Sequence, residues 1–209
     1  MEYTPATGHG QRHDPFKSLV VPRPIGWLST RSAAGIDNLA PFSHWQNLMG
    51  RPPMVMFAAT QSLLGGRKDT VRNIEETGWF VWNMATSALR DAVNTSGLSL
   101  PEGVDEFDLA GVTKAESVLA PAPRVAESPC HLECSYVQTV RIPGTGGDSV
   151  DLIIGRVEQV HIADDVIGAD GKLDIAKIKP LARLGYYDYA VVDEVFEMKP
   201  PAAYVEATL

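Results

Sequence analysis

Cysteine is nearly absent from this sequence, with only Cys130 and Cys134 among 209 residues. If both lie on one β-strand, their Cα atoms are ~13 Å apart at about 3.3 Å per residue, beyond the ~7 Å limit for a disulfide. We therefore expect no disulfide and a reducing compartment such as the cytoplasm.

Long hydrophobic runs and an excess of positive charge are also missing. No apolar run reaches the roughly 18 residues that a membrane helix needs, and the first ten residues lack the basic and apolar regions of a signal peptide. The 18 Lys and Arg residues are outnumbered by 26 Asp and Glu residues, for a net charge of −8. Nucleic-acid backbones are bound by a surplus of Lys and Arg. These absences predict a soluble, cytoplasmic protein with no membrane and no nucleic-acid partner.

The composition is otherwise that of a folded domain, with 44% hydrophobic residues. Because strand and helix patterns run on without a linker-like break, we expect a single domain over residues 1–209. Residues 1–14 lack an apolar pattern and are predicted to form a flexible or loosely docked N-terminal arm. Residues 98–124 are rich in Pro, Gly and acidic side chains, and they are predicted to form a long excursion of the kind that often makes a lid or a subunit contact.

Apolar runs and period-two alternation predict a fold built mainly of β-strands. Strands are expected over 25–30, 38–47, 54–60, 79–85, 130–142 and 150–162, with a bulge near Gly155. Helices are expected over 69–77, with Asp69 as N-cap and Gly78 as stop, and over 87–96, with Ser87 as cap. A short helix within 173–184 and a closing strand over 191–198 complete the chain. The predicted fold class is mainly β with minor α, a small antiparallel barrel with two or three short helices.

The chain is organised around residues 24–70, where a hairpin is followed by a basic loop that opens a helix. Arg67, Lys68, the Thr70 hydroxyl and the first helical amides can together bind a phosphate, provided that Asp69 turns inward to cap the helix. The alternative interpretation is a solvated basic turn. Small and polar residues lie at the end of the first hairpin strand and across the hairpin from it. They suit a ligand that is part aromatic plate and part phosphate, such as FMN; they are Ser29, Thr30, Asn38, Ala40, Pro41 and Ser43. Any single one of them can equally be an ordinary turn or strand residue.

Four motifs occur in a characteristic order. They are Arg23-Pro-Ile-Gly-Trp-Leu-Ser-Thr-Arg, Asn38-Leu-Ala-Pro-Phe-Ser, Arg67-Lys-Asp-Thr-Val-Arg-Asn-Ile and Glu127-Ser-Pro-Cys-His-Leu-Glu-Cys. At these residues the chain resembles the flavin reductase-like and flavoredoxin proteins of the FMN-binding split-barrel superfamily, over roughly residues 17–200. The resemblance implies a Greek-key-like split β-barrel, FMN as cofactor and a homodimer with FMN near the subunit interface. It also implies that Arg183 and Tyr186 approach the cofactor.

The resemblance implies an FMN-dependent oxidoreductase that receives electrons from NAD(P)H or from a protein donor. Hydride transfer to a flavin needs no acid, base or nucleophile from the protein, so the absence of a catalytic triad and of a paired-carboxylate motif is expected. No metal site is expected. Gly147-Asp148-Ser149 differs from the Gly-Asp-His segment of short-chain flavin reductases, in which the His helps to place the nicotinamide. With Ser149 in place of that His, the resemblance does not imply that the protein uses NAD(P)H directly. The alternatives are an FMN carrier or electron-transfer module, and an enzyme that acts on another small substrate with FMN bound.

Overall fold

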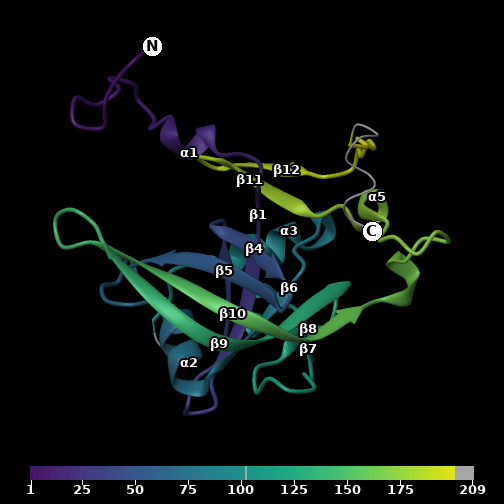
Figure 1. Cartoon of the computed structure of the whole chain (residues 1–209). Helices are drawn as coiled ribbons and strands as arrows, with labels where there is room; N and C mark the ends of the chain where they lie inside the picture. The colour runs from purple at the N-terminus through teal and green to yellow at the C-terminus, as the bar shows by residue number, and fades with distance from the viewer. Residues whose placement is uncertain (102, 201–209) are drawn as a thin grey trace.

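The computed structural model describes residues 1–101 and 103–200. Seven strands form one antiparallel sheet in the order β3-β2-β6-β9-β10-β5-β4 (Figure 1). These strands are β2 (Gly26–Arg31), β3 (Asp37–Phe42), β4 (Trp45–Gly50), β5 (Pro53–Thr60), β6 (Trp79–Asn83), β9 (Cys130–Pro143) and β10 (Ser149–Ile162). The predicted mainly β, antiparallel architecture is confirmed.

The sheet curls because its two edge strands are consecutive in the chain. Only Ser43 and His44 separate β3 from β4, so the two edges must lie close together. At this seam the Ala58 N–H donates to the His44 carbonyl at 2.8 Å. The single strand predicted over 38–47 is wrong, because its first half pairs with β2 and its second half pairs with β5.

A smaller sheet of three strands lies above the barrel in Figure 1. It contains β1 (Arg23–Pro24), β11 (Leu181–Gly185) and β12 (Asp188–Val191). The helix predicted within 173–184 is confined to α5 (Ile175–Ile178), because Lys179 adopts a left-handed conformation and the chain then enters β11. The closing strand predicted over 191–198 is wrong. Val195 and Phe196 are 61% and 82% exposed, and no neighbouring strand pairs with them among the described residues.

The helix α2 (Asp69–Thr77) has the predicted bounds and ends at Gly78, which is left-handed at φ 77°. The predicted cap is wrong, because Lys68 occupies the N-cap position and the Asp69 carboxylate pairs with Arg72. The second predicted helix is a 3-10 turn, η1 (Ser87–Leu89), followed by α3 (Arg90–Thr95), and the Ser87 side chain makes no cap. The other helical segments are α1 (Phe16–Leu19), α4 (Glu106–Ala110) and η2 (Asp164–Val166).

The excursion over residues 98–124 has structure of its own. It contains α4 and the strand β7 (Lys114–Ala115), which pairs with β8 (Arg124–Val125). The buried carboxylate of Glu133 on β9 accepts hydrogen bonds from three successive backbone N–H groups, those of Val118, Leu119 and Ala120. These bonds hold the excursion against the barrel.

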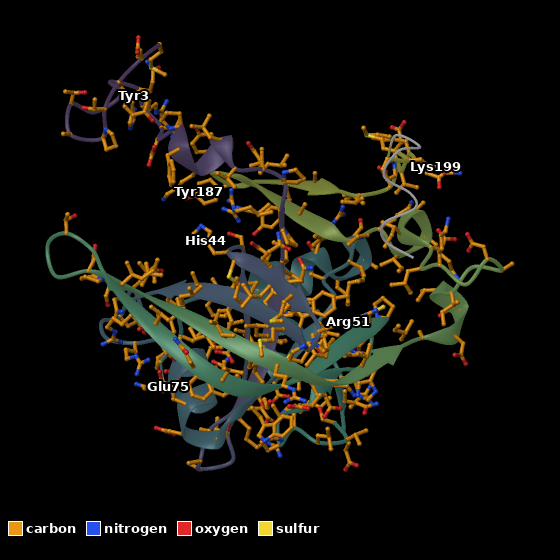
Figure 2. The ribbon with its side chains drawn as sticks, viewed as in Figure 1. Tyr3, His44, Arg51, Glu75, Tyr187 and Lys199 are labelled. Atoms are coloured by element: carbon orange, nitrogen blue, oxygen red, sulfur yellow. The ribbon has the colours of Figure 1, made fainter. Side chains whose placement is uncertain are left out.

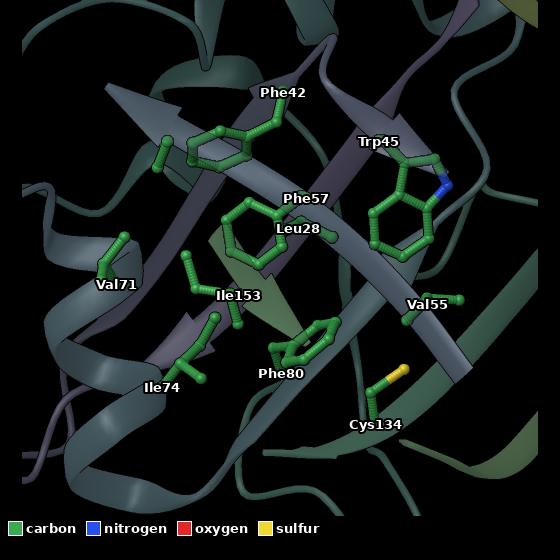
Figure 3. Packing of buried hydrophobic residues seen from close by; sticks show 11 residues of the cluster. Leu28, Phe42, Trp45, Val55, Phe57, Val71, Ile74, Phe80, Cys134 and Ile153 are labelled. Atoms are coloured by element: carbon green, nitrogen blue, oxygen red, sulfur yellow. The ribbon is translucent and has the colours of Figure 1, made fainter. Parts of the chain in front are cut away.

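The main hydrophobic core fills the barrel. Figure 3 shows Phe57, Phe80 and Ile153 packed together, with Ile74 of α2 directed toward them. The predicted irregularity at Gly155 is confirmed, since the β9–β10 register shifts between Ile154 and Gly155. A Cβ at Gly155 would lie 2.4 Å from the Phe80 ring, so this position requires glycine. Cys130 and Cys134 are buried and free, as expected.

Residues 1–14 contain no helix or strand. The ring of His13 lies 5.3 Å from the ring of Tyr186, so this segment contacts the β11–β12 hairpin. Over residues 1–101 and 103–200, no helix has the length and apolar character needed to cross a membrane.

Candidate functional site

A cavity of about 400 Å³ lies at the seam of the barrel. Its walls are β3, the Ser43–His44 connection, the end of β5, the loop that enters α2, and residues 96–100. Eight of the predicted site residues line it, namely Asn38, Ala40, Pro41, Ser43, Arg67, Lys68, Asp69 and Thr70. The tertiary fold therefore brings the hairpin residues and the basic loop to one place.

The start of α2 faces this cavity with unpaired donors. No side chain caps the helix, and among the described residues the N–H groups of Asp69 and Thr70 have no hydrogen-bond acceptor. The preceding Gly65 and Gly66 have φ of 95° and 74°, which only glycine adopts readily. Lys68 is half-buried and forms no ion pair in the described part of the chain. This end of the cavity has the donors of an anion site.

Arg67 is engaged by two acidic residues instead. Its two terminal nitrogens donate to the Glu75 carboxylate at 2.6 Å each, and its Nε donates to Asp151 at 3.0 Å. The hydrogen bonds that Arg67 donates to Glu75 raise its pKa further above the ordinary value. Desolvation opposes this effect, and the hydrogen bond to Asp151 adds to it. Asp151 also accepts two hydrogen bonds from Arg141. Arg67 therefore fixes the loop to the barrel as well as lining the cavity.

Asn38 and Thr70 join the two halves of the site. The Asn38 side-chain amide donates to the Thr70 hydroxyl at 3.1 Å, which ties β3 to the first turn of α2. Asp69 and Arg72, one turn apart on α2, both line the cavity and form an ion pair. Asp69 is therefore neutralised by Arg72 without acting as a cap.

Glu106 is a cavity residue that sequence reasoning missed. The residue is 7% exposed, and its carboxylate accepts a hydrogen bond from the Leu39 N–H at 3.0 Å. Burial raises the pKa of Glu106. Hydrogen bonds from the backbone N–H groups of Leu39 and of Glu106 itself oppose this effect, and the negative charges of Asp69 and Asp105 add to it. No local signal identifies Glu106, because it comes from the excursion 67 residues after Leu39.

His44 lies at the other end of the cavity, between the barrel and the three-stranded sheet (Figure 2). Burial lowers its pKa, and the charges of Arg23 and Lys17 lower it further. The other lining residues that sequence reasoning did not select are Phe42, Ala58, Thr60, Ser62, Leu64, Gly65, Arg72, Ser96, Gly97, Leu98, Ser99 and Leu100. Phe42 and Arg72 lie within the motifs that carry the family resemblance, and residues 98–100 begin the predicted excursion.

Ser29 and Thr30 do not line the cavity. Both are fully buried in β2, where the Ser29 hydroxyl donates to the Pro123 carbonyl and the Thr30 hydroxyl accepts from Asn73 at 3.1 Å. In this single chain the two side chains therefore hold β2 in place behind the cavity wall.

Arg183 and Tyr186 do not line the cavity either, since they lie on the β11–β12 hairpin. The Arg183 guanidinium donates to the Tyr186 carbonyl and the Tyr189 hydroxyl. Arg183 is paired in register with Arg23, whose charge acts on His44. The hairpin is thus placed beyond the His44 end of the site.

Comparison with known proteins identifies the family. The family model described as "Flavin reductase like domain" matches residues 18–192. An uncharacterized protein of Halalkalibacterium halodurans is 37% identical over 183 residues, which are 87% of each chain. The crystal structure of nitrilotriacetate monooxygenase component B from Bacillus cereus is 29% identical and has a TM-score of 0.86, covering 95% of this chain and 98% of that chain. A Shewanella frigidimarina structure described with a split barrel domain has 21% identity and a TM-score of 0.78, covering 89% of this chain and 90% of that chain. The predicted split-barrel fold is confirmed.

Proposed function

Since this chain belongs to the flavin reductase like family, we propose that it is an oxidoreductase that binds FMN in the seam cavity and passes electrons through it. One observation carries the proposal. The cavity joins an uncapped helix start with a basic residue, Lys68, to a wall of small β3 residues, Ala40 and Pro41. A cavity of this size lies within the ~300–1,000 Å³ that is usual for ligand sites.

The phosphate end of FMN is assigned to the start of α2. The free N–H groups of Asp69 and Thr70, the Thr70 hydroxyl and the Lys68 ammonium provide directed donors and one cation. Arg67 belongs to this end as the residue that fixes the loop. The Asp69 carboxylate is compatible with a phosphate because Arg72 neutralises it.

The ring end is assigned to β3 and the Ser43–His44 connection. Ala40, Pro41 and Ser43 offer a narrow wall with small side chains, which allows close approach of a planar ring. The bound flavin would supply the hydride and electron chemistry, and the protein's part is to position it and to exclude water. Ser29 and Thr30 support β2 beneath this wall, and Asn38 links it to the phosphate end.

The first test is an absorbance spectrum of the purified protein under anaerobic conditions, before and after NADH or NADPH is added. A flavin band that bleaches identifies a nicotinamide-dependent reductase. A flavin band that persists with every nicotinamide and reductase tested favours a second candidate function, an FMN carrier or electron-transfer module. No flavin band after reconstitution with FMN would overturn the proposal.

The second candidate is favoured by Ser149, which replaces the His of the Gly-Asp-His segment. The Ser149 hydroxyl accepts a hydrogen bond from the Gln61 side chain at 2.8 Å, and the neighbouring Ser62 lines the cavity. Position 149 therefore adjoins the loop that lines the cavity. Introduction of Ser149→His tests this point, since it should increase the rate of reduction by NADPH or NADH if the His alone is missing.

A cytoplasmic homodimer completes the proposal. The edge strand β4 is solvent-exposed after Trp45, with Leu48 45% and Met49 43% exposed. An unpaired edge with apolar side chains is suited to burial against a second copy. A partner packed near the seam also gives Arg183 and Tyr186 a route to the cofactor that the single chain does not provide.

A further inference from the structure

Glu106 is a buried acidic residue in a cavity whose proposed ligand is an anion. It lines the seam cavity together with residues 96–100, which have no ionisable side chain. Its carboxylate accepts from the Leu39 N–H on β3. The preceding residue, Asn38, donates to the Thr70 hydroxyl in the first turn of α2. Glu106 therefore lies one strand position away from the contact that reaches the proposed phosphate end.

No cation pairs with the Glu106 carboxylate among residues 1–101 and 103–200, although charged groups surround it. Asp105 is its neighbour on the excursion and forms an ion pair with Lys114. Asp37 on β3 pairs with Lys114 at 2.9 Å and with Arg31 at 2.6 Å. The nearby cations on these two elements are thus engaged by other carboxylates, which leaves Glu106 with uncharged hydrogen-bond donors.

The helices beside Glu106 offer no free cation either. On α2, Asp69 and Arg72 line the cavity as an ion pair. The helix α3 packs against α4, and its ionisable residues are Arg90 and Asp91, whose side chains are 71% and 99% exposed. Lys68 is the basic residue that the described part of the chain leaves for an anionic ligand.

An anionic ligand in this cavity favours the neutral form of Glu106 for two physical reasons. A phosphate monoester has a second pKa of about 6, so it carries close to two negative charges above pH 7, and Lys68 offsets only one of them. A ligand that fills the cavity also removes the remaining water from the carboxylate, and desolvation disfavours the charged form. Burial already raises the pKa of Glu106 in the free protein.

We propose that Glu106 takes up a proton from solvent when FMN binds, so that the flavin phosphate shares the cavity with a neutral carboxylic acid. The inference rests on the proposed function, because it requires the phosphate in the seam cavity. The proton forms an O–H bond on a carboxylate oxygen, and no other bond changes. Since the bound state holds this additional proton, FMN affinity falls as the pH rises, by at most about tenfold per pH unit.

The test is titration calorimetry of the full chain with FMN at pH 7.5, in two buffers that differ in ionisation enthalpy. The difference between the two heats gives the number of protons taken up per FMN. Wild-type protein should take up a large fraction of one proton and lose affinity several-fold between pH 7 and pH 8.5. Glu106→Gln keeps an acceptor for the Leu39 N–H, and it should take up none. It should also bind FMN more tightly than the wild type at pH 8.5, a gain that a merely structural role would not produce.

Asp108→Asn is the matched control. It removes one negative charge from the same helix, but Asp108 is exposed and does not line the cavity, so this variant should keep the wild-type proton uptake. An infrared difference spectrum of wild-type protein labelled with ¹³C-glutamate needs no variant. It should show loss of a carboxylate band and gain of a carboxylic-acid band when FMN binds.

The outcomes separate this inference from the proposed function. FMN binding without proton uptake, or without a carboxylic-acid band, would overturn the inference and leave the FMN site intact. Equal proton uptake in Glu106→Gln and the wild type would assign the proton to another group and would also overturn it. If the wild-type protein does not bind FMN, the proposed function itself fails.

Discussion

The guanidinium of Arg67 forms a two-pronged pair with Glu75, with both terminal nitrogens 2.6 Å from a carboxylate oxygen. The next residue, Lys68, has no acidic partner within the described chain. Figure 2 shows Glu75, a residue of α2, on the side of the barrel away from the β11–β12 hairpin. Two adjacent basic residues therefore have separate tasks, in which Arg67 fixes the loop and Lys68 offers charge to the cavity.

Lys68→Ala should weaken FMN binding about 10- to 100-fold, because a charge-assisted hydrogen bond contributes roughly 1.5–3 kcal/mol. Riboflavin lacks the phosphate, so its affinity should not change. Titration calorimetry with both ligands measures the difference. Lys172→Ala, in an exposed turn, is the control. Equal losses for FMN and riboflavin would show that Lys68 does not bind the phosphate.

Arg67→Ala should lower the free energy of unfolding by about 1–3 kcal/mol, because the buried Asp151 then keeps only Arg141 as a partner among the described residues. Arg67→Lys should recover only part of this loss, since an ammonium cannot make the two-pronged contact with Glu75. Urea unfolding of the flavin-free protein measures both. An unchanged unfolding midpoint together with lost FMN affinity would instead make Arg67 the main phosphate residue.

The Glu133 carboxylate should make the free energy of unfolding decrease as the pH falls into the acid range. Burial raises its pKa, but hydrogen bonds from the N–H groups of Val118, Ala120 and Leu119 and from His161 outweigh burial and leave the pKa at about 2. Its ordinary value is 4.5, so the unfolded chain binds the proton first as the pH falls. About 3 kcal/mol of stability is present above pH 4.5 and is lost toward pH 2.

Glu133→Gln is expected to remove this pH dependence and to lower stability at neutral pH. Urea unfolding between pH 2 and pH 6 compares it with the wild type. The exposed Glu127, which also accepts from a backbone N–H in the same region, gives the matched control Glu127→Gln. Parallel pH profiles for wild type and Glu133→Gln would contradict the prediction.

Gly155→Ala should destabilise the barrel by about 1–3 kcal/mol, because the new Cβ falls 2.4 Å from the buried Phe80 ring. Phe80→Leu opens this space, so the double variant should lose less stability than the sum of the two single variants. Thermal or urea unfolding of all four proteins completes the cycle. Additive losses would mean that residues 80 and 155 do not share a packing contact.

Leu48→Asp should dissociate the proposed dimer, because a charge on the β4 edge cannot be buried against a second copy without a partner. Light scattering coupled to size exclusion measures the molar mass, which should change from twice the chain mass of 22.6 kDa to that of one chain. Leu63→Asp, at a more exposed leucine outside β4, is the control. A monomeric wild-type protein would contradict the dimer itself.

Local sequence determined much of the fold. The apolar spacing and Gly78 defined α2 over Asp69–Thr77, and the long alternating patterns defined β9 and β10 with the irregularity at Gly155. The same local signals marked the hairpin and the basic loop, whose residues do line one cavity. These features depend on neighbours within a few residues, so a pattern read along the chain contains them.

Only the tertiary structure decided which partners these residues meet. Arg67 is held by Asp151, 84 positions away, and Glu106 enters the cavity wall from an excursion with no local signal. The chain turns at Ser43 and His44 because β3 and β4 pair with different strands, and Ser29 and Thr30 are buried because the sheet curls over them. Pairing, burial and charge balance depend on residues distant in sequence, so they follow from the closed barrel and not from any one segment.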